Sequence, residues 1–301
     1  MTGTSTRAHH RSARRGFWTA YQPGFRVSDA PLASPEFFAE VEADRYSLEP
    51  AIEELARFES WANRDVLEAG CGIASDGMRF VRAGARYTGL DFSPVALDVA
   101  RRRLELEGGS AGFVSGDITD LPFPSESFDL VYSNGVIHHV PDTARAVNEF
   151  HRVLRPGGTA LVMVYHRSSF NYFFTIMLLR RLLAGLLLIP GAERAVAWLT
   201  GEPVELLRDH KRLLRKLGGR YLTDPATFLS RNTDGPANPL SKVYTRRSGS
   251  AFFDAFDSVT TEVRFLILRT YPLGERIARA RMATALERRW GWHLWIRAIK
   301  A

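Results

Sequence analysis

Two short motifs have the residue types and spacing of a nucleotide-binding site. Gly70 and Gly72 follow a short apolar run and precede a helical pattern. Glycines at such a turn let backbone N–H groups approach a ligand, and the N-terminus of the following helix is slightly positive. Asp91 ends the next apolar run about 20 residues later, where an acid can bind both hydroxyls of a ribose. Nicotinamide-dependent oxidoreductases share this arrangement, so these two motifs leave the cofactor open.

Three further motifs narrow the choice. Residues 116–118 read Gly-Asp-Ile, residues 133–135 read Ser-Asn-Gly, and Pro-Gly-Gly at 156–158 ends a helical pattern. In this order the motifs resemble those of class I S-adenosylmethionine-dependent methyltransferases, in particular the broad group of ubiquinone- and menaquinone-type enzymes. The resemblance covers residues 63–166 most closely and resumes at 245–301. It is specific for the family and says little about the substrate.

The resemblance implies roles for the first motifs. Gly70 and Gly72 would lie under the methionine part of S-adenosylmethionine, with Cys71 as a small filler between them. Glu68 would help to fix the glycine loop and the amino group of the cofactor. Asp91 would hold the ribose hydroxyls. Cys71 has no partner base nearby in the sequence, so we expect no nucleophilic role for it.

The later motifs would surround the adenine and the reactive end of the cofactor. The resemblance implies that Phe92 flanks the adenine, that Asp117 accepts a hydrogen bond from its amino group, and that Ile118 packs on the ring. Asn134 would lie near the carboxypropyl chain and the sulfonium. Ala74 departs from the family pattern, which commonly has glycine there. The extra methyl group is tolerated if the local φ is negative.

The sequence offers two candidate general bases, His139 and His166. The resemblance places His138 and His139 on a loop over the active site, but adjacent side chains point in different directions, so we expect no metal site. His166 follows the strand predicted at 159–165, and ligands of parallel α/β sheets bind at the carboxyl ends of the strands. His139 and His166 are the candidates if the acceptor is a carbon or oxygen acid, whereas an amine or thiol needs no base.

Strands and helices alternate through the first half of the chain, which is typical of a parallel α/β sheet. We therefore predict the α/β class. As the family's fold implies, this is a Rossmann-like, seven-stranded, mostly parallel sheet whose last strand is antiparallel, with a helical cap insertion. Strands are predicted at 65–68, 86–90, 112–115, 128–133, 159–165, 258–265 and 292–298.

The same pattern divides the chain into successive segments. We predict a disordered tail at 1–15, a helical and aromatic cap segment at 16–60, the cofactor-binding core at 61–166, a helical cap insertion at 167–244, and completion of the sheet at 245–301.

Composition excludes several classes of protein. The chain has 301 residues, 45% of them hydrophobic and 24% charged, as in ordinary globular proteins. Its one cysteine excludes a disulfide framework and a thiolate zinc site. The most apolar stretch, 170–189, is interrupted by Arg180 and Arg181, so we predict no transmembrane helix and a cytoplasmic protein.

Charge is distributed unevenly. Residues 1–166 hold 17 lysines and arginines against 22 acidic residues, whereas residues 167–301 hold 23 against 11. The basic half suggests an acidic substrate, a membrane surface or nucleic acid. We do not expect nucleic acid, because the chain has no Asn-Pro-Pro-Tyr-like motif and no catalytic cysteine. Peripheral membrane contact stays open, as does the oligomeric state.

The predicted function is SN2 transfer of a methyl group from S-adenosylmethionine to a small, hydrophobic or lipid-like acceptor in small-molecule or secondary metabolism. Methylation at C, O or N is not distinguished. A non-catalytic S-adenosylmethionine-binding protein and a nicotinamide-dependent oxidoreductase are the alternatives. The acceptor should be walled by residues 170–190 and by Phe17, Trp18 and Tyr21. We expect the arginines of the insertion to face outward, namely Arg180, Arg181, Arg208, Arg212 and Arg215.

Overall fold

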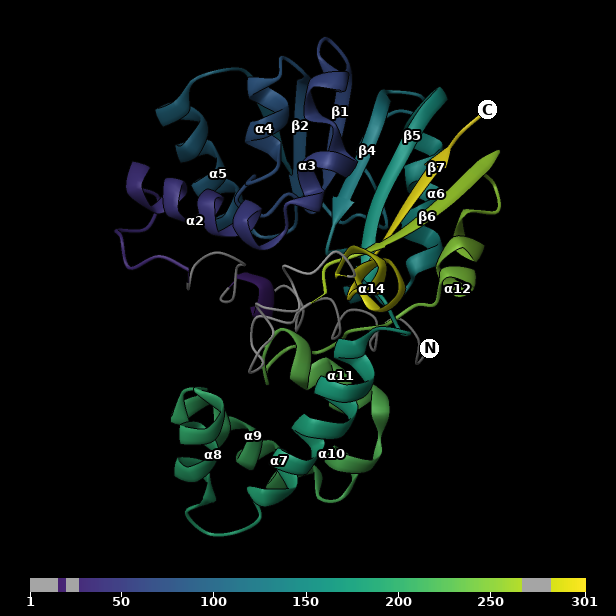
Figure 1. The fold of residues 1–301 in the computed structure, drawn as a ribbon. Coiled ribbons are helices and arrows are strands. Elements are labelled where there is room, and N and C mark those ends of the chain that lie inside the picture. Colours follow the sequence, from purple (N-terminus) through teal and green to yellow (C-terminus); the bar gives the residue numbers. More distant parts are fainter. Residues whose placement is uncertain (1–15, 20–26, 267–282) are drawn as a thin grey trace, which may run out of the picture.

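The structure is a computed structural model that describes residues 16–19, 27–266 and 283–301. The tail predicted at 1–15 and Tyr21 lie outside the described residues. Figure 1 shows an α/β core with helices on both sides of its sheet, and a separate group of helices beyond one end of the strands.

The core is a seven-stranded sheet in the order β3-β2-β1-β4-β5-β7-β6. The first five strands pair in parallel, and β7 lies antiparallel between β5 and β6. The predicted fold class is confirmed. The strands are β1 (Asp65–Ala69), β2 (Arg86–Asp91), β3 (Ala111–Ser115), β4 (Phe128–Asn134), β5 (Leu154–Tyr165), β6 (Ser258–Arg264) and β7 (His293–Ile299).

Helices and short 3-10 turns cover the sheet, and side chains cap the start of two of the helices. The Ser93 hydroxyl accepts the N–H of Ala96 at 3.3 Å, and the Asp142 carboxylate accepts that of Arg145 at 3.0 Å. The elements are α2 (Pro35–Leu48), α3 (Ala51–Ala56), η1 (Phe58–Trp61), α4 (Gly77–Arg82), α5 (Pro94–Glu107), η2 (Ile137–His139), α6 (Thr143–Val153), α12 (Arg246–Ser250), η4 (Ala251–Phe253) and α14 (Ala283–Trp290).

The central strands are apolar on both faces because each face has its own core. On one face, Leu67 and Val131 belong to a cluster with Phe150 of α6. On the other face, Leu130 belongs to a cluster with Phe80 of α4. All five side chains are fully buried. This two-sided burial explains the nearly unbroken apolar run at 159–165, in the fifth strand.

The insertion after β5 folds as a helical cap with its own core. Ile176, Tyr221 and Phe228 are buried together there, and the cluster reaches the sheet through Trp292. Among the described residues, no helix has both the length and the apolar character needed to cross a bilayer. The cap consists of the π-helical η3 (Asn171–Arg180), α7 (Arg181–Leu186), α8 (Ala192–Thr200), α9 (Val204–Leu217), α10 (Arg220–Thr223) and α11 (Pro225–Thr233).

Two of the five cap arginines do not face outward as expected. Arg208, Arg212 and Arg215 are exposed. Arg180 is partly buried, where it pairs with Glu202 at 2.9 Å and donates to a backbone carbonyl. Arg181 lies over the Phe228 ring at 5.1 Å, so its guanidinium is packed against the cap core. The expectation failed because a guanidinium can be buried when a carboxylate or an aromatic ring lies against it.

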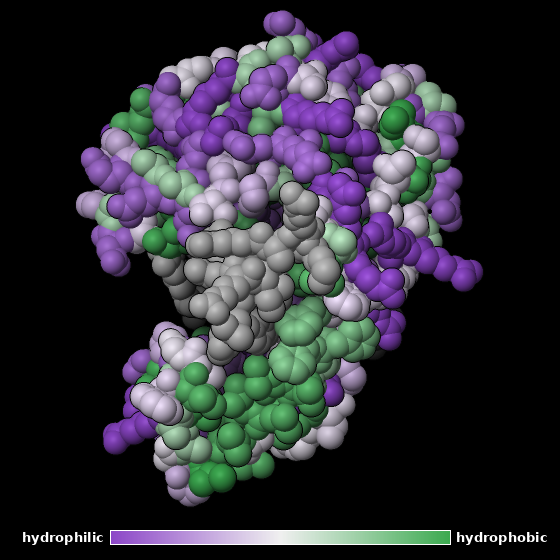
Figure 2. Space-filling view, viewed as in Figure 1, coloured by the Kyte–Doolittle hydropathy of each residue, from purple (hydrophilic) through white to green (hydrophobic). Residues whose placement is uncertain are grey.

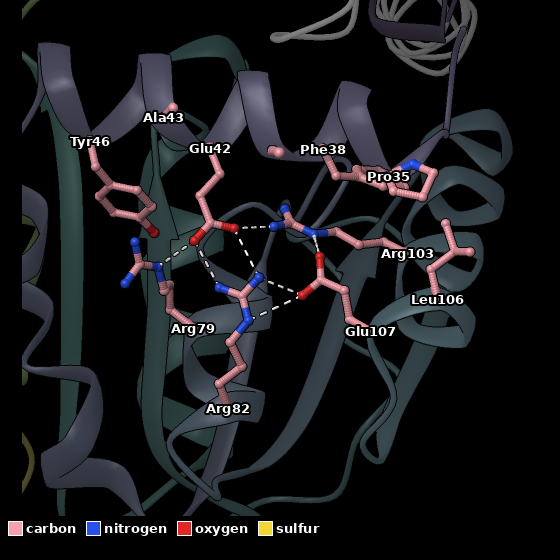
Figure 3. A pocket seen from close by; sticks show the side chains of 11 residues that line it. Pro35, Phe38, Glu42, Ala43, Tyr46, Arg79, Arg82, Arg103, Leu106 and Glu107 are labelled. Carbon is pink, nitrogen blue, oxygen red and sulfur yellow. Dashed lines mark hydrogen bonds and ion pairs between the residues drawn. The ribbon is translucent and has the colours of Figure 1, made fainter. Parts of the chain in front are cut away.

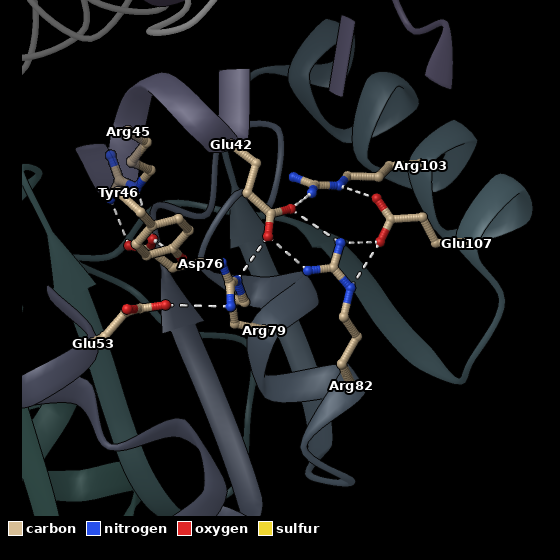
Figure 4. Close-up of polar contacts among 9 residues, drawn as sticks. All are labelled: Glu42, Arg45, Tyr46, Glu53, Asp76, Arg79, Arg82, Arg103 and Glu107. Carbon is tan, nitrogen blue, oxygen red and sulfur yellow. Dashed lines mark hydrogen bonds and ion pairs between the residues drawn. The ribbon is translucent and has the colours of Figure 1, made fainter. Parts of the chain in front are cut away.

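Helix α2 is fixed to the core by an ion cluster (Figure 4). Glu42 lies 2.7 Å from Arg79 and from Arg82, and it also accepts from the buried Arg103. Burial opposes ionisation of Glu42, but the hydrogen bond from Arg82 and the charges of Arg103, Arg82 and Arg79 outweigh it and lower the pKa. Glu107 completes the cluster by accepting from Arg82 and Arg103.

A cavity of about 510 Å³ lies beside this cluster (Figure 3). Its walls come from α2, α4 and α5, with Pro35, Phe38 and Leu106 on the apolar side. None of the cofactor-site residues predicted from the sequence lines it. The cavity is therefore separate from the candidate site.

Glu42→Gln should lower the free energy of unfolding by about 2 kcal/mol, because it leaves the buried Arg103 guanidinium with one carboxylate instead of two. Urea denaturation measures the change. The control is Glu105→Gln, whose exposed pair with Arg102 should contribute less than about 0.5 kcal/mol. Equal effects of the two substitutions would contradict the role given to the cluster.

Candidate active site

The glycine loop leaves the carboxyl end of β1 with backbone angles that favour glycine. Gly70 has φ 86° and Gly72 has φ 52°. A Cβ on Gly70 would lie 2.5 Å from a methyl carbon of Val136, so that position also lacks room for a side chain. The loop can thus present bare backbone to a ligand.

Asp91 and Gly72 lie together as the sequence predicts. The Asp91 carboxylate accepts the N–H of Gly72 at 2.9 Å and that of Ser93 at 2.8 Å. Burial raises the pKa of Asp91, and these backbone hydrogen bonds offset part of the rise. The carboxylate therefore joins the turn after β1 to the turn after β2.

Glu68 lies beneath the start of α4. Its buried carboxyl accepts the Tyr87 hydroxyl, and a Cβ on Gly77 would lie 2.8 Å from the same oxygen. Burial and the nearby charge of Asp76 raise the pKa of Glu68 well above its ordinary value. This position agrees with a role in supporting the glycine loop.

Asp76 is a buried residue of the candidate site that sequence reasoning missed. It follows the glycine loop directly and is fully buried. Burial opposes its ionisation, but the charge and hydrogen bonds of Arg45 lower its pKa, with further hydrogen bonds from Tyr132 and Asn134. The Arg45 pair has two hydrogen bonds, with Nε 2.7 Å and Nη2 2.5 Å from the carboxylate. Tyr46 donates a further hydrogen bond at 3.0 Å.

Asn134 lies in the same network. Its side-chain amide donates to Asp76 at 3.2 Å and to the Tyr132 hydroxyl at 3.1 Å. The position of Asp76 at the end of the glycine motif was the available signal. Nothing in the local pattern identifies Arg45 as its partner, because α2 lies 31 residues earlier in the chain.

The residues predicted around the adenine follow the ends of β2 and β3. Asp117 accepts both the backbone N–H and the hydroxyl of Thr119, at 3.0 and 2.8 Å, so it also shapes its own turn. Ile118 is buried in the core cluster that contains Leu90. Phe92 is half-buried directly after Asp91. Contact of Phe92, Asp117 and Ile118 with adenine stays a prediction.

Cys71 is buried in this loop. Burial and the neighbouring charges of Asp91 and Glu68 raise the pKa of its thiol well above its ordinary value. A thiol in that state is a weak nucleophile. The side chain lies close to Gly89, where a Cβ would be 2.9 Å from the sulfur. Its position agrees with a small filler.

Ala74 does not meet the condition set for it. Its φ is 55°, in the left-handed region, rather than negative. The chain turns at Ala74 between the glycine loop and α4, and the Ala74 N–H donates to the carbonyl of Cys71 at 2.8 Å. A β-carbon at this φ strains the backbone, which is why glycine is common at such positions.

His139 lies on the 3-10 turn after β4, at the carboxyl edge of the sheet. Its Nδ1 is 2.8 Å from the carbonyl of Leu240, in the segment that returns from the cap. A carbonyl only accepts, so Nδ1 carries a proton. Trp18 packs on the imidazole at 4.7 Å between ring centres. The N-terminal segment thus reaches His139 at this edge of the sheet.

Asp234 is a second residue that the sequence did not indicate. Its carboxylate lies 3.6 Å from His139 Nε2 and accepts the Tyr165 hydroxyl at 2.8 Å. Asn238 donates to it at 3.1 Å. The cap therefore brings a carboxylate to the imidazole. Neighbouring His138 is fully buried, and burial lowers its pKa well below its ordinary value.

His166 contacts the segment that precedes β7. Its Nδ1 lies 3.1 Å from the carbonyl of Gly291, directly before β7, and its backbone N–H donates to Trp292. Burial lowers its pKa. These contacts tie β5 to β7. A catalytic role for His166 stays a prediction, and the surroundings favour His139.

Similarity to known proteins agrees with this geometry. The fold matches the magnesium protoporphyrin IX methyltransferase of Synechocystis, solved with bound S-adenosylhomocysteine, with a TM-score of 0.55 and 12% identity over 97% of this chain and 100% of that one. Residues 67–162 match the methyltransferase domain family. These residues therefore match a methyltransferase domain in sequence, and the fold agrees with it, so S-adenosylmethionine is the expected cofactor.

Curated relatives match the same part of the chain. A probable S-adenosylmethionine-dependent methyltransferase of Mycolicibacterium smegmatis is 37% identical over 36% of this chain and 41% of its own length. A fatty-acid O-methyltransferase of that organism is 36% identical over 43% and 47%. The phthiotriol/phenolphthiotriol dimycocerosates methyltransferase of Mycobacterium leprae is 39% identical over 32% and 36%. The chain spans less than half the length of each of these relatives.

The residues present fit this cofactor. Gly70 and Gly72 give a backbone surface without side chains, and Asp91 gives a carboxylate at the end of the next strand.

Asp91→Asn should weaken binding of S-adenosylmethionine by about 2 kcal/mol, because a charged acceptor is lost. Calorimetric titration measures this. Asp98→Asn, on the exposed face of α5, is the control, and an equal affinity of Asp91→Asn and wild type would overturn the assignment.

Ala74→Gly should raise the free energy of unfolding by about 1 kcal/mol, because it removes the strain of a β-carbon at φ 55°. Chemical denaturation measures it. The control is Ala39→Gly on the exposed surface of α2, which should lower stability by about 1 kcal/mol. A loss of stability in both variants would contradict the strain argument.

Proposed function

We propose that the chain methylates an apolar, lipid-like acceptor at an atom that must lose a proton. The observation that carries the proposal is the meeting of three segments at one sheet edge. His139 follows β4, Asp234 and Leu240 come from the end of the cap, and Trp18 comes from the N-terminal segment. Fatty-acid and dimycocerosate methyltransferases among the relatives support an apolar acceptor.

The cap supplies an apolar surface beside these polar groups. Tyr172 and Met177 of η3 pack with Tyr165, at the end of β5, against the cap core. A hydrocarbon chain placed against this surface would lose contact with water, which is favourable by about 25 cal/mol per Å². Only the inner face of residues 170–190 therefore supports the prediction that these residues wall the acceptor site. The outer face of the same block is exposed.

The cofactor supplies an activated methyl group on sulfur. His139 takes the acceptor proton at Nε2, while the Leu240 carbonyl holds the tautomer through Nδ1. The Asp234 carboxylate stabilises the imidazolium that results. Held by Gly70, Gly72 and Asp91, S-adenosylmethionine would supply the methyl group, and the acceptor atom that His139 has deprotonated would take it.

His139→Asn should lower kcat about a hundredfold or more, because the proton acceptor is lost. Affinity for S-adenosylmethionine should stay within about twofold, since His139 lies outside the glycine loop. The measurement is transfer of a labelled methyl group to long-chain alcohols, phenols and carboxylic acids. His166→Asn is the comparison. A large loss of kcat in His166→Asn, with His139→Asn active, would assign the base to His166 instead.

Other features of the whole chain also belong to the proposal. A cytoplasmic location and a place in small-molecule or secondary metabolism stay predictions, as does contact with a membrane surface. Oxygen is the acceptor atom named for several relatives, including the fatty-acid O-methyltransferase, and it agrees with the need for a base. Transfer to a carbon acid would use the same groups.

A further inference from the structure

One outer face of the cap exposes large apolar side chains. Phe173, Leu178, Leu182 and Leu186 recur along the continuous helix of η3 and α7, and each is exposed. Spacing of four or five residues places them on one side of a helix that is partly π-helical. Figure 2 shows a broad hydrophobic region over this part of the cap.

Further large apolar side chains are exposed in the turn and the helix that follow. Leu188 and Ile189 are exposed in the turn, and Trp198 and Leu199 of α8 are 87% and 66% exposed. Nine of the sixteen exposed large hydrophobic residues of the described chain lie between 173 and 199. Scattered exposed leucines are ordinary, but apolar residues gathered in this way mark a contact surface.

The charges of the cap decide which partner fits. Each of the four acidic residues between 171 and 223 forms an ion pair with a lysine or arginine. The pairs are Glu193 with Lys211, Glu202 with Arg180, Glu205 with Arg208, and Asp209 with Arg212. Residues 171–223 hold nine basic residues against these four. The surplus charge of the cap is therefore entirely positive.

Part of this surplus lies next to the apolar face. Arg194 is exposed one helical turn before Trp198, on the same side of α8. Neither Arg194 nor the exposed Arg215 and Lys216 has an ion pair within the described part of the chain. Arginine beside exposed tryptophan and leucine suits a lipid interface, where the ring enters the headgroup region and the cation meets phosphate.

We propose that this face of the cap docks on the surface of an anionic lipid bilayer. A second copy of the chain fits less well, because it would bring surplus positive charge against positive charge. The inference assigns the membrane contact named above to one face of the cap, and it does not depend on the proposed reaction. If both hold, the acceptor crevice works close to the bilayer.

Vesicle sedimentation tests the proposal with the full chain. Binding should be clear on vesicles that contain phosphatidylglycerol, at least tenfold weaker on pure phosphatidylcholine, and reduced by salt. The double substitution Leu182→Ser with Leu186→Ser, and separately Trp198→Ser, should each weaken binding at least tenfold. The matched control replaces exposed leucines outside the cap, Leu32→Ser with Leu48→Ser, and should leave binding unchanged.

Charge substitutions and oligomeric state complete the test. Arg194→Glu should weaken binding to the anionic vesicles more than Arg64→Glu, an exposed arginine of the core. Circular dichroism and S-adenosylmethionine binding show whether each variant is folded. Absence of vesicle binding by the wild type, or equal binding by the cap and control variants, overturns the proposal. So does a wild-type dimer that Leu182→Ser dissociates while vesicles stay unbound, because the face would then join two copies.

Discussion

A buried carboxylate must be paired, and the pairing of Asp76 arranges the candidate site. Arg45 reaches it from α2, and Tyr132 and Asn134 reach it from β4. One group therefore fixes the N-terminal helix, the start of α4 and the end of the central strand relative to one another. The Glu42 cluster holds the same face of this helix one turn earlier, so α2 is attached at two points.

The parallel sheet brings the residues of the candidate site to one edge. Because the carboxyl ends of β1, β2 and β4 meet at one edge of the sheet, the glycine loop, Asp91 and His139 follow strands that end at this edge. The cap is inserted directly after β5, and its last segment returns past the same edge, where the backbone N–H of Lys242 donates to His138. Cofactor binding thus rests on the domain shared with many methyltransferases, and we propose that acceptor choice rests on the cap.

The sequence was informative where structure follows local patterns. The strands could be located because both faces of the sheet are covered, and Gly70, Gly72 and Asp91 could be found because their spacing follows the strand–helix repeat. Pairs between distant segments could not be predicted, and His139 meets Leu240 across 101 residues. The left-handed φ of Ala74 was also missed, because closure of the loop sets it and not the preference of alanine. The partial burial of Arg180 and Arg181 was not predicted either, because only the folded cap brings Glu202 and Phe228 next to them.

The central claim is that this crevice binds S-adenosylmethionine and not a nicotinamide dinucleotide, although both would use glycines and an acid in these places. Calorimetric titration of the full chain with S-adenosylhomocysteine and with NAD tests it most directly. The account predicts saturable binding of S-adenosylhomocysteine with one site per chain and no detectable binding of NAD. Saturable binding of NAD, or failure of S-adenosylhomocysteine to bind the folded protein, would contradict it.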